Sequence, residues 1–181
     1  MTSSSFDRSS LLDSDSMQQT IQRMADQIQA TIEDQGSLVF VGIQKGGVIL
    51  AKRLSRIVFE GKGSSRTVGI LDIGMHRDDL DQNRVPEIKP TDIPFDVTGK
   101  SVVLVDDVLF SGRTIRAAMD AITDLGRPGR ILLAVLVDRG HRELPIKADF
   151  VGEVVETSPD QFVDVQLTEE GIGDYIFLKG K

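Results

Sequence analysis

The sequence predicts an α/β protein built on a parallel β-sheet with helices on its faces. Three short runs are rich in β-branched and other apolar residues, as buried strands are, at 37–43, 101–107 and 130–138. Two longer stretches repeat apolar residues every three or four positions, as amphipathic helices do, at 17–32 and 113–125. Because strands and helices alternate along the chain, we expect one central parallel sheet.

The remaining elements follow from the N-terminus onward. Residues 1–10 are polar and predict a disordered tail, and residues 11–181 are expected to form a single domain. The Ser/Asp cluster at 13–16 can cap the first helix. A second helical stretch is expected at 48–59, and a further strand at 67–75.

The stretch 76–99 is polar and carries three of the six prolines, which predicts a long loop. Gly126 and Pro128 are expected to end the helix that begins near Arg113. Beyond the 130–138 strand the pattern changes, and short strands are expected near 149–156, 162–167 and 174–178.

Composition excludes several classes of function. Acidic residues outnumber basic ones, 28 to 21, for a net charge of -7, which disfavours broad binding to nucleic acids or anionic membranes. The absence of cysteine rules out disulfides, thiolate metal sites and cysteine nucleophiles, and two histidines are too few for a histidine metal site without carboxylate ligands. No apolar run approaches the ~20 residues that span a bilayer. A cytoplasmic enzyme or binding protein is the expectation.

The segment VVLVDDVLFSGRT joins paired carboxylates to an anion-binding turn. A buried strand brings Asp106 and Asp107 to the edge of the sheet, where exposure and no role in the core are expected. Ser111, Gly112 and Thr114 then open a helix, whose N-terminal N–H groups attract anions. The Gly-Lys-Ser/Thr of a P-loop is absent. Carboxylates beside a phosphate pocket suit a sugar phosphate, because they accept from vicinal hydroxyls.

The same segment resembles the phosphoribosyl pyrophosphate (PRPP) motif of the type I phosphoribosyltransferases. DIGMHRDDL (72–80) and VDRGHRELPI (137–146) resemble segments of one branch, the PyrR-type pyrimidine operon attenuators with uracil phosphoribosyltransferase activity. The resemblance covers roughly residues 11–180 in register. It implies the type I phosphoribosyltransferase fold, a central parallel sheet flanked by helices with a mobile loop and a small hood.

The resemblance implies that different residues of this motif bind the ribose and the 5′-phosphate of PRPP. Asp106 and Asp107 would act in catalysis by holding the ribose hydroxyls, with Mg²⁺ bound directly or through ribose or water. The 5′-phosphate would be bound by Leu109, Phe110, Ser111, Gly112, Arg113 and Thr114.

The loop at 42–47 corresponds in the resemblance to the pyrophosphate-binding loop, with Gln44, Lys45 and Gly46 as its binding residues. A Gly-rich turn after a strand exposes N–H groups, and Lys45 adds positive charge. The resemblance also implies a cis peptide between Gln44 and Lys45, a bond that outside proline is found mainly at functional sites.

Two arginines lie in the polar loop that follows. The resemblance implies a mobile loop that closes over PRPP, with Arg77 in a catalytic role and Arg84 at the pyrophosphate. The residues alone favour solvated surface charges at both positions.

The base-binding group that the resemblance implies comprises Val137, Asp138, Arg139 and Val163. The first three end a buried strand, where backbone groups can pair with the edge of a pyrimidine. His141 and Arg142 are expected to organise this turn or a subunit contact.

The chain departs from the resembling families at two sites near the substrate. Purine enzymes commonly place an aspartate where this chain has Phe110, and a phenyl ring cannot transfer a proton, so a pyrimidine is favoured. The PyrR-type branch usually has tyrosine there. Its pyrophosphate loop usually contains Thr-Arg-Gly, whereas this chain has Lys45-Gly46-Gly47, and Arg and Lys bind phosphate differently.

The face that binds RNA in the resembling branch also differs. Where that branch has basic residues and a histidine on the first helix, this chain has Gln18, Gln19 and Asp26, and keeps Arg23. Glu153 replaces a lysine. Carboxylates repel RNA phosphates, so RNA binding is expected to be weak.

The resulting hypothesis is a uracil phosphoribosyltransferase that converts uracil and PRPP to UMP and pyrophosphate, and that can also regulate pyrimidine genes. Two alternatives stay open: an RNA-binding attenuator that responds to UMP and PRPP with little catalysis, and a purine phosphoribosyltransferase. The resemblance implies a homodimer or higher homo-oligomer, and no membrane partner is expected.

Overall fold

The computed structural model describes residues 8–61, 67–73, 91–171 and 173–180. Its centre is a five-stranded parallel sheet with the order β3-β2-β4-β5-β6. The strands are β2 (Leu38–Ile43), β3 (Gly69–Leu71), β4 (Ser101–Leu109), β5 (Arg130–Asp138) and β6 (Phe150–Val154). The predicted parallel α/β sheet is confirmed.

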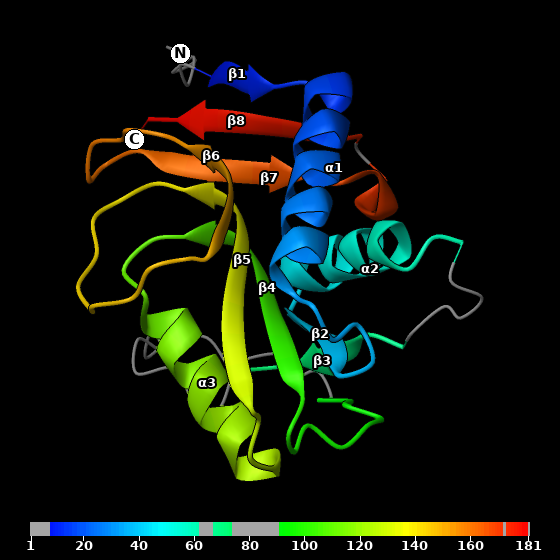
Figure 1. Cartoon of the computed structure of the whole chain (residues 1–181). Helices are drawn as coiled ribbons and strands as arrows, with labels where there is room; N and C mark the ends of the chain where they lie inside the picture. The colour runs from blue at the N-terminus through cyan, green and yellow to red at the C-terminus, as the bar shows by residue number, and fades with distance from the viewer. Residues whose placement is uncertain (1–7, 62–66, 74–90, 172, 181) are drawn as a thin grey trace, which may run out of the picture.

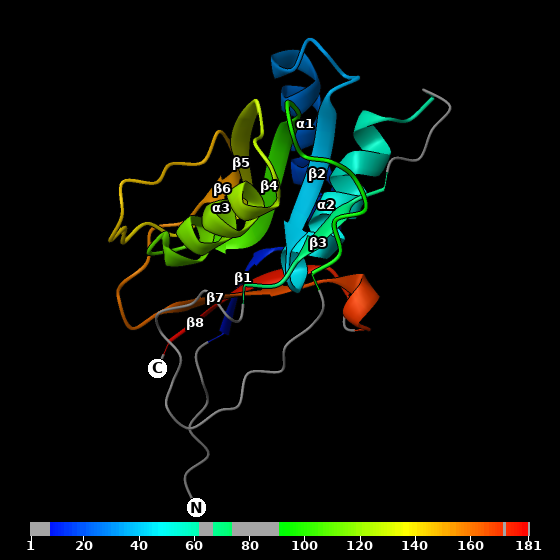
Figure 2. The same ribbon diagram turned by 90° about the horizontal axis from the view of Figure 1, so that it is seen from below.

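Among the described residues, three helices cover the two faces of the sheet: α1 (Ser14–Thr31), α2 (Gly46–Val58) and α3 (Arg113–Leu125). Helices α1 and α2 lie on one face and α3 on the other (Figure 2). Strand β4 shows why both faces are buried. Val103 and Val105 pack toward α1 and α2, whereas Val102 and Leu104 pack toward α3.

Asp13 caps α1, as the Ser/Asp cluster predicted. Its side chain accepts a hydrogen bond from Ser16 N at 2.9 Å. The apolar stripe of the helix, which includes Met17, Ile21 and Ile28, is buried against the sheet and α2.

A second, three-stranded antiparallel sheet, called the hood below, has the order β1-β8-β7. It comprises β1 (Arg8–Leu12), β7 (Phe162–Gln166) and β8 (Tyr175–Lys179), with a short 3-10 helix, η1 (Thr168–Glu170), between the last two. Strands β4 and β5 point their carboxyl ends toward the hood (Figure 1), and β7 contacts β4. The hood therefore lies at the sheet edge where ligands of α/β proteins bind.

Several predicted boundaries were wrong. Residues 8–10 were expected in the tail but pair with β8, because the hood offers them a strand partner. The strand expected at 67–75 is shorter, since pairing with β2 begins at Gly69 and ends at Leu71, and residues 74 and 75 lie outside the described part. Helix α2 begins at Gly46, so the glycines expected in the loop belong to the helix N-terminus.

Residues 91–99, the described part of the predicted 76–99 loop, are anchored to the sheet. Ile70 and Asp92 exchange two backbone hydrogen bonds, 2.7 and 2.8 Å long, and Val97 is buried. No helix among the described residues has the length and apolar character needed to span a membrane.

Arg53 of α2 joins the hood to the parallel sheet's helices. Its Nε donates to Glu169 Oε1 at 2.9 Å, and its Nη1 and Nη2 donate to Asp174 at 2.7 and 2.8 Å. Nη2 also binds the second oxygen of Glu169. Thr168 contributes two more donors to Asp174, its N at 2.7 Å and its Oγ1 at 2.9 Å.

These contacts predict a loss of stability in acid. Hydrogen bonds from Arg53 lower the pKa of Glu169 below its ordinary 4.5. Burial raises the pKa of Asp174, but hydrogen bonds from Arg53 and Thr168 outweigh it, so this pKa lies below 3.8. A carboxyl group whose pKa is lower in the folded state stabilises the fold above its unfolded pKa, and this stability disappears as pH falls through the folded pKa.

We therefore expect the free energy of unfolding to fall more between about pH 6 and about pH 3 in the wild type than in Arg53→Met. Urea titrations at both pH values measure this difference. Equal pH dependence in the two proteins would contradict the contribution of the cluster.

Candidate active site

Strand β4 carries the paired carboxylates to the edge of the sheet that faces the hood. The strand continues two residues beyond its predicted end, to Leu109, between β2 and β5. Asp106 is therefore buried, with 6 % of its surface exposed, and Asp107 is half-buried. The expected exposure was wrong for Asp106, because the sheet and α2 still enclose that position.

Backbone groups hold both carboxylates in place. Asp106 Oδ1 accepts from Asp107 N at 3.0 Å, and Asp107 Oδ1 accepts from Val108 N at 2.8 Å. One oxygen of each carboxylate is thus bound by the neighbouring backbone N–H group. The other oxygen of Asp107, Oδ2, faces the N-terminus of α2.

The turn between β2 and α2 packs directly against Asp107. A Cβ atom at Gly46 would lie 2.5 Å from Asp107 Oδ2, and one at Gly47 would lie 2.3 Å from Val105 O. Only glycine permits this approach. The peptide between Gln44 and Lys45 is cis, as predicted. The sheet thereby places the positive end of α2, at Gly46, beside the carboxylate of Asp107, 61 positions further along the chain.

The turn between β4 and α3 lines a pocket at the position where the sequence predicted a phosphate site. A pocket of about 240 Å³ is lined by Val108, Leu109, Phe110, Ser111, Gly112, Arg113, Thr114, Ile115 and Glu143. Gly112 is the N-cap of α3 with a φ of 91°, a conformation that favours glycine. The N-terminus of α3 opens into this pocket, so the six predicted phosphate-binding residues all line one anion-suited cavity.

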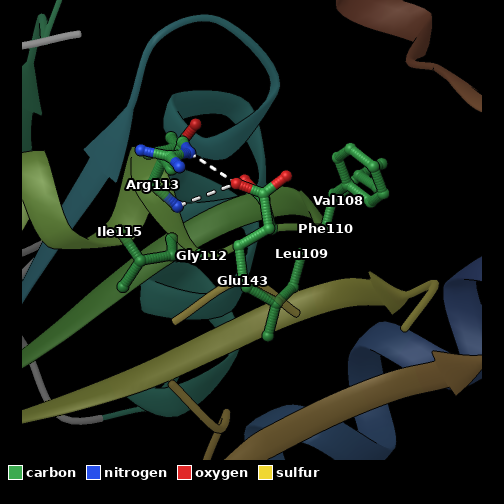
Figure 3. A pocket seen from close by; sticks show the side chains of 9 residues that line it. Val108, Leu109, Phe110, Gly112, Arg113, Ile115 and Glu143 are labelled. Atoms are coloured by element: carbon green, nitrogen blue, oxygen red, sulfur yellow. Dashed lines mark hydrogen bonds and ion pairs between the residues drawn. The ribbon is translucent and has the colours of Figure 1, made fainter. Parts of the chain in front are cut away.

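Glu143 is a pocket residue that sequence reasoning missed. Its carboxylate binds Arg113 Nε at 2.6 Å, and Figure 3 shows it extending toward Arg113 from a neighbouring segment. Its N and that of Leu144 both donate to Ser111 O, at 3.0 and 3.2 Å. The segment had been recognised as distinctive, but a contact across 30 residues leaves no local signal.

Arg142 organises the turn after β5, as expected. It donates to Phe110 O at 2.7 Å and to Gly140 O at 3.1 Å, and it forms an ion pair with Asp138. Burial raises the pKa of Asp138, but the hydrogen bonds from Arg142 and Gly140 outweigh it and the net shift is downward. Both oxygens of Asp138 are engaged inside the turn, since Oδ1 accepts from Gly140 N at 3.0 Å.

Arg139, directly after the end of β5, is a buried cation. Its guanidinium carbon lies 4.0 Å from the centre of the Phe110 ring, and no described residue accepts a hydrogen bond from its Nε. Burial lowers its pKa. The Phe110 ring is 39 % exposed and makes an edge contact with His141 at 6.1 Å. A flat ring with a partly unsatisfied donor beside it suits a planar ligand that carries a carbonyl.

The other predicted site residues fall into two groups. The Val137 side chain is fully buried in the core, and Val163 of β7 is partly buried and packs on the same core cluster. Arg77 and Arg84 lie outside the described residues.

Comparisons with known proteins agree with this geometry. The phosphoribosyl transferase domain family matches residues 7–170. A "Bifunctional protein PyrR" of Chloroflexus aurantiacus is 49% identical over 172 residues, which cover 94% of each chain. Proteins of the same name from Thermus aquaticus and Bacillus cereus are 50% identical over 163 residues and 45% identical over 174 residues, with at least 90% of each chain covered.

Solved structures share the fold. A hypoxanthine phosphoribosyl transferase of Trypanosoma cruzi superimposes with a TM-score of 0.73 at 17% identity, and covers 100% of this chain and 95% of its own. A hypoxanthine-guanine phosphoribosyltransferase of Bacillus anthracis has a TM-score of 0.71 at 22% identity, with 96% and 97% covered. At such identities the likeness concerns the fold alone. The family model and the sequence matches together show that this chain belongs to the phosphoribosyltransferase family, in its branch of bifunctional PyrR proteins.

Proposed function

We propose that this protein is a uracil phosphoribosyltransferase that joins the ribose of PRPP to N1 of uracil. The observation that carries the proposal is the meeting of Gly46 and Asp107, which brings a helix N-terminus and a carboxylate to one side of the phosphate-type pocket. This arrangement supports binding of one ligand with two phosphate groups on either side of a sugar.

In this proposal each part of PRPP has a place. The pocket at the N-terminus of α3 takes the 5′-phosphate, Asp106 and Asp107 accept from the ribose hydroxyls, and Lys45 with the N-terminus of α2 takes the pyrophosphate. The bond from ribose C1 to the pyrophosphate oxygen breaks, the bond from C1 to uracil N1 forms, and the N1 proton passes to the departing pyrophosphate or to water. The residues act by positioning the reactants and stabilising the departing negative charge.

Mg²⁺ fits the donor set at this edge. The described residues contain no group of three or more His, Cys, Asp or Glu that could hold a metal ion by themselves. Mg²⁺ is usually bound by one or two carboxylates together with substrate phosphates. Asp106 and Asp107 would hold it jointly with PRPP, and the ion would neutralise charge on the pyrophosphate.

The base is assigned to the space beside Arg139 and Phe110. Arg139 can donate to a pyrimidine carbonyl, and Phe110 offers a ring surface but no proton, which supports uracil over a purine. Val163 on the hood is assigned to the cover of the base, and Arg77 and Arg84 remain proposals for the pyrophosphate side. We include a homodimer or higher homo-oligomer in the proposal.

The test is PRPP-dependent conversion of uracil to UMP with Mg²⁺ present, with hypoxanthine and guanine as competing bases. We expect uracil to be converted to UMP and neither purine to be converted to its nucleotide. Consumption of either purine at a rate similar to uracil would support the purine alternative and overturn the assignment of the base site.

A second candidate function is regulation through RNA, which the name of the bifunctional relatives keeps open. On this chain, the surface of α1 and β6 that would contact RNA pairs its own arginine with a carboxylate. Arg23 donates to Glu153 Oε1 at 3.1 Å and to Gly152 O at 2.6 Å, and Thr20 Oγ1 donates to the same carboxylate oxygen at 3.1 Å. The cation retained on this face is therefore already paired with a carboxylate.

We expect weak binding of a pyrimidine-operon leader RNA, and expect Glu153→Lys to raise the affinity by about tenfold at ~0.1 M salt. The replacement releases Arg23 and adds a cation that can neutralise a phosphate. Filter binding across a salt series measures both the affinity and the salt slope.

Asp124→Lys on α3 is the matched control, because it makes the same change of charge on the opposite face of the sheet. Tight binding by the wild type that UMP enhances, and that a scrambled hairpin does not reproduce, would show that the regulatory function is retained at full strength.

A further inference from the structure

The guanidinium of Arg53 binds both carboxylates at the turn that joins β7 to β8. The side chains of Arg53 and Asp174 are only 17% and 15% exposed, so this is not a solvated surface pair. Bidentate contacts of a guanidinium with carboxylates fix direction as well as distance. The apolar contacts of the hood, through Leu167 and Ile176, are non-directional by comparison.

The position of Arg53 on α2 connects two parts of the site. Gly46, at the first turn of this helix, lies against Asp107. Arg53 follows seven residues later, about 10 Å along the same helix axis. One rigid helix therefore carries the pyrophosphate-side turn at its start and the hood contact two turns further on.

The hood contact reaches the base side through β7. Asp174, held by Arg53, accepts from both the N and the Oγ1 of Thr168, directly after Leu167, which is fully buried. Strand β7, which carries Val163, ends at Gln166, one residue before Leu167, and this strand contacts β4. The carboxylates that Arg53 binds thus tie the residues that follow this strand to α2.

We propose that Arg53 is a positioning residue for the nucleobase: it fixes the hood at the angle that places β7 over the base, relative to the pyrophosphate bound at the start of the same helix. This inference rests on the proposed function, because it needs the base to lie under β7. It assigns no direct contact between Arg53 and a substrate.

The test is steady-state kinetics of Arg53→Met with uracil and PRPP varied separately. Methionine keeps the apolar stem of the side chain and removes its charge. We expect the KM for uracil to rise about tenfold, which corresponds to about 1.4 kcal/mol. The KM for PRPP is expected to change by less than about twofold, because both phosphate sites lie on the parallel sheet.

Two further variants separate positioning from general destabilisation. Arg53→Lys retains the charge but cannot bind both carboxylates in bidentate fashion, so an intermediate KM for uracil is expected. Arg56→Met, one turn further along α2 and exposed, is the matched control and should behave as the wild type. Amide hydrogen exchange without ligand should be faster in β7 and β8 of Arg53→Met, and unchanged in β4 and β5.

The outcomes are distinct. An unchanged KM for uracil in Arg53→Met overturns the inference, and so does an equal rise of both KM values with faster exchange throughout the sheet, which marks a merely structural role. If the wild type does not convert uracil at all, the proposed function fails. Hydrogen exchange then still tests the contact between Arg53 and the hood, and unchanged exchange in β7 rejects it.

Discussion

Replacing Asp107 with Asn is expected to lower kcat by about 100-fold or more while the melting temperature stays near that of the wild type. The proposed reaction needs a negative charge at the ribose and Mg²⁺ side of the pocket, and Asn supplies none. The fold should persist, because an amide oxygen can still accept from Val108 N, as Asp107 Oδ1 does at 2.8 Å.

Asp106→Asn is expected to have a similar effect on turnover. Although Asp106 is buried, Asn can retain the 3.0 Å hydrogen bond that Asp106 accepts from Asp107 N. Both variants are measured by kcat, apparent KM for PRPP and thermal melting, and Asp124→Asn on the exposed side of α3 is the control. Full activity with unchanged apparent PRPP affinity in both variants would end the assignment of the ribose site.

Replacing Gly46 with Ala is the second change from which we expect a large effect, a fall in kcat/KM for PRPP of about 100-fold. The new Cβ would lie 2.5 Å from Oδ2 and 2.9 Å from Cγ of Asp107, so the carboxylate or the turn must shift. In an ordinary helix alanine is more favourable than glycine by up to about 1 kcal/mol, so loss of activity would not reflect helix propensity.

A double-mutant cycle identifies the cause. If Gly46→Ala acts by displacing Asp107, adding it to Asp107→Asn should reduce activity much less than it does in the wild type. Gly180→Ala is the control, because a Cβ there meets nothing within 4 Å. Additive effects in the cycle would show that Gly46 acts independently of Asp107.

Much of the architecture was predictable because its signals are local. Buried strands such as β4 and β5 appear as short β-branched runs, and the stripe of α1 appears as a period of three to four residues. The cap at Asp13 and the turn at Gly112 depend on one or two residues each. Errors occurred where a partner strand decides an element, as at residues 8–10, which pair with β8 at the far end of the chain.

The candidate site divides in the same way. The sequence by itself determined the chemistry that is available: paired carboxylates at 106 and 107, two Gly-rich turns at helix starts, and a family membership that later comparisons confirmed. The residues of each chemical feature lie within a few positions of one another, so strand and helix periodicity suffices to place each feature on its element.

Only the tertiary structure decided which of these groups meet. It placed Gly46 against Asp107, buried Asp106, brought Glu143 to Arg113, and paired Arg53 with Glu169 and Asp174. The last pairing joins residues more than a hundred positions apart. Such contacts depend on how sheets and helices pack. Whether a charged side chain is buried or solvated depends on the groups around it, which exclude water and supply a partner of opposite charge, and these groups come from distant parts of the sequence.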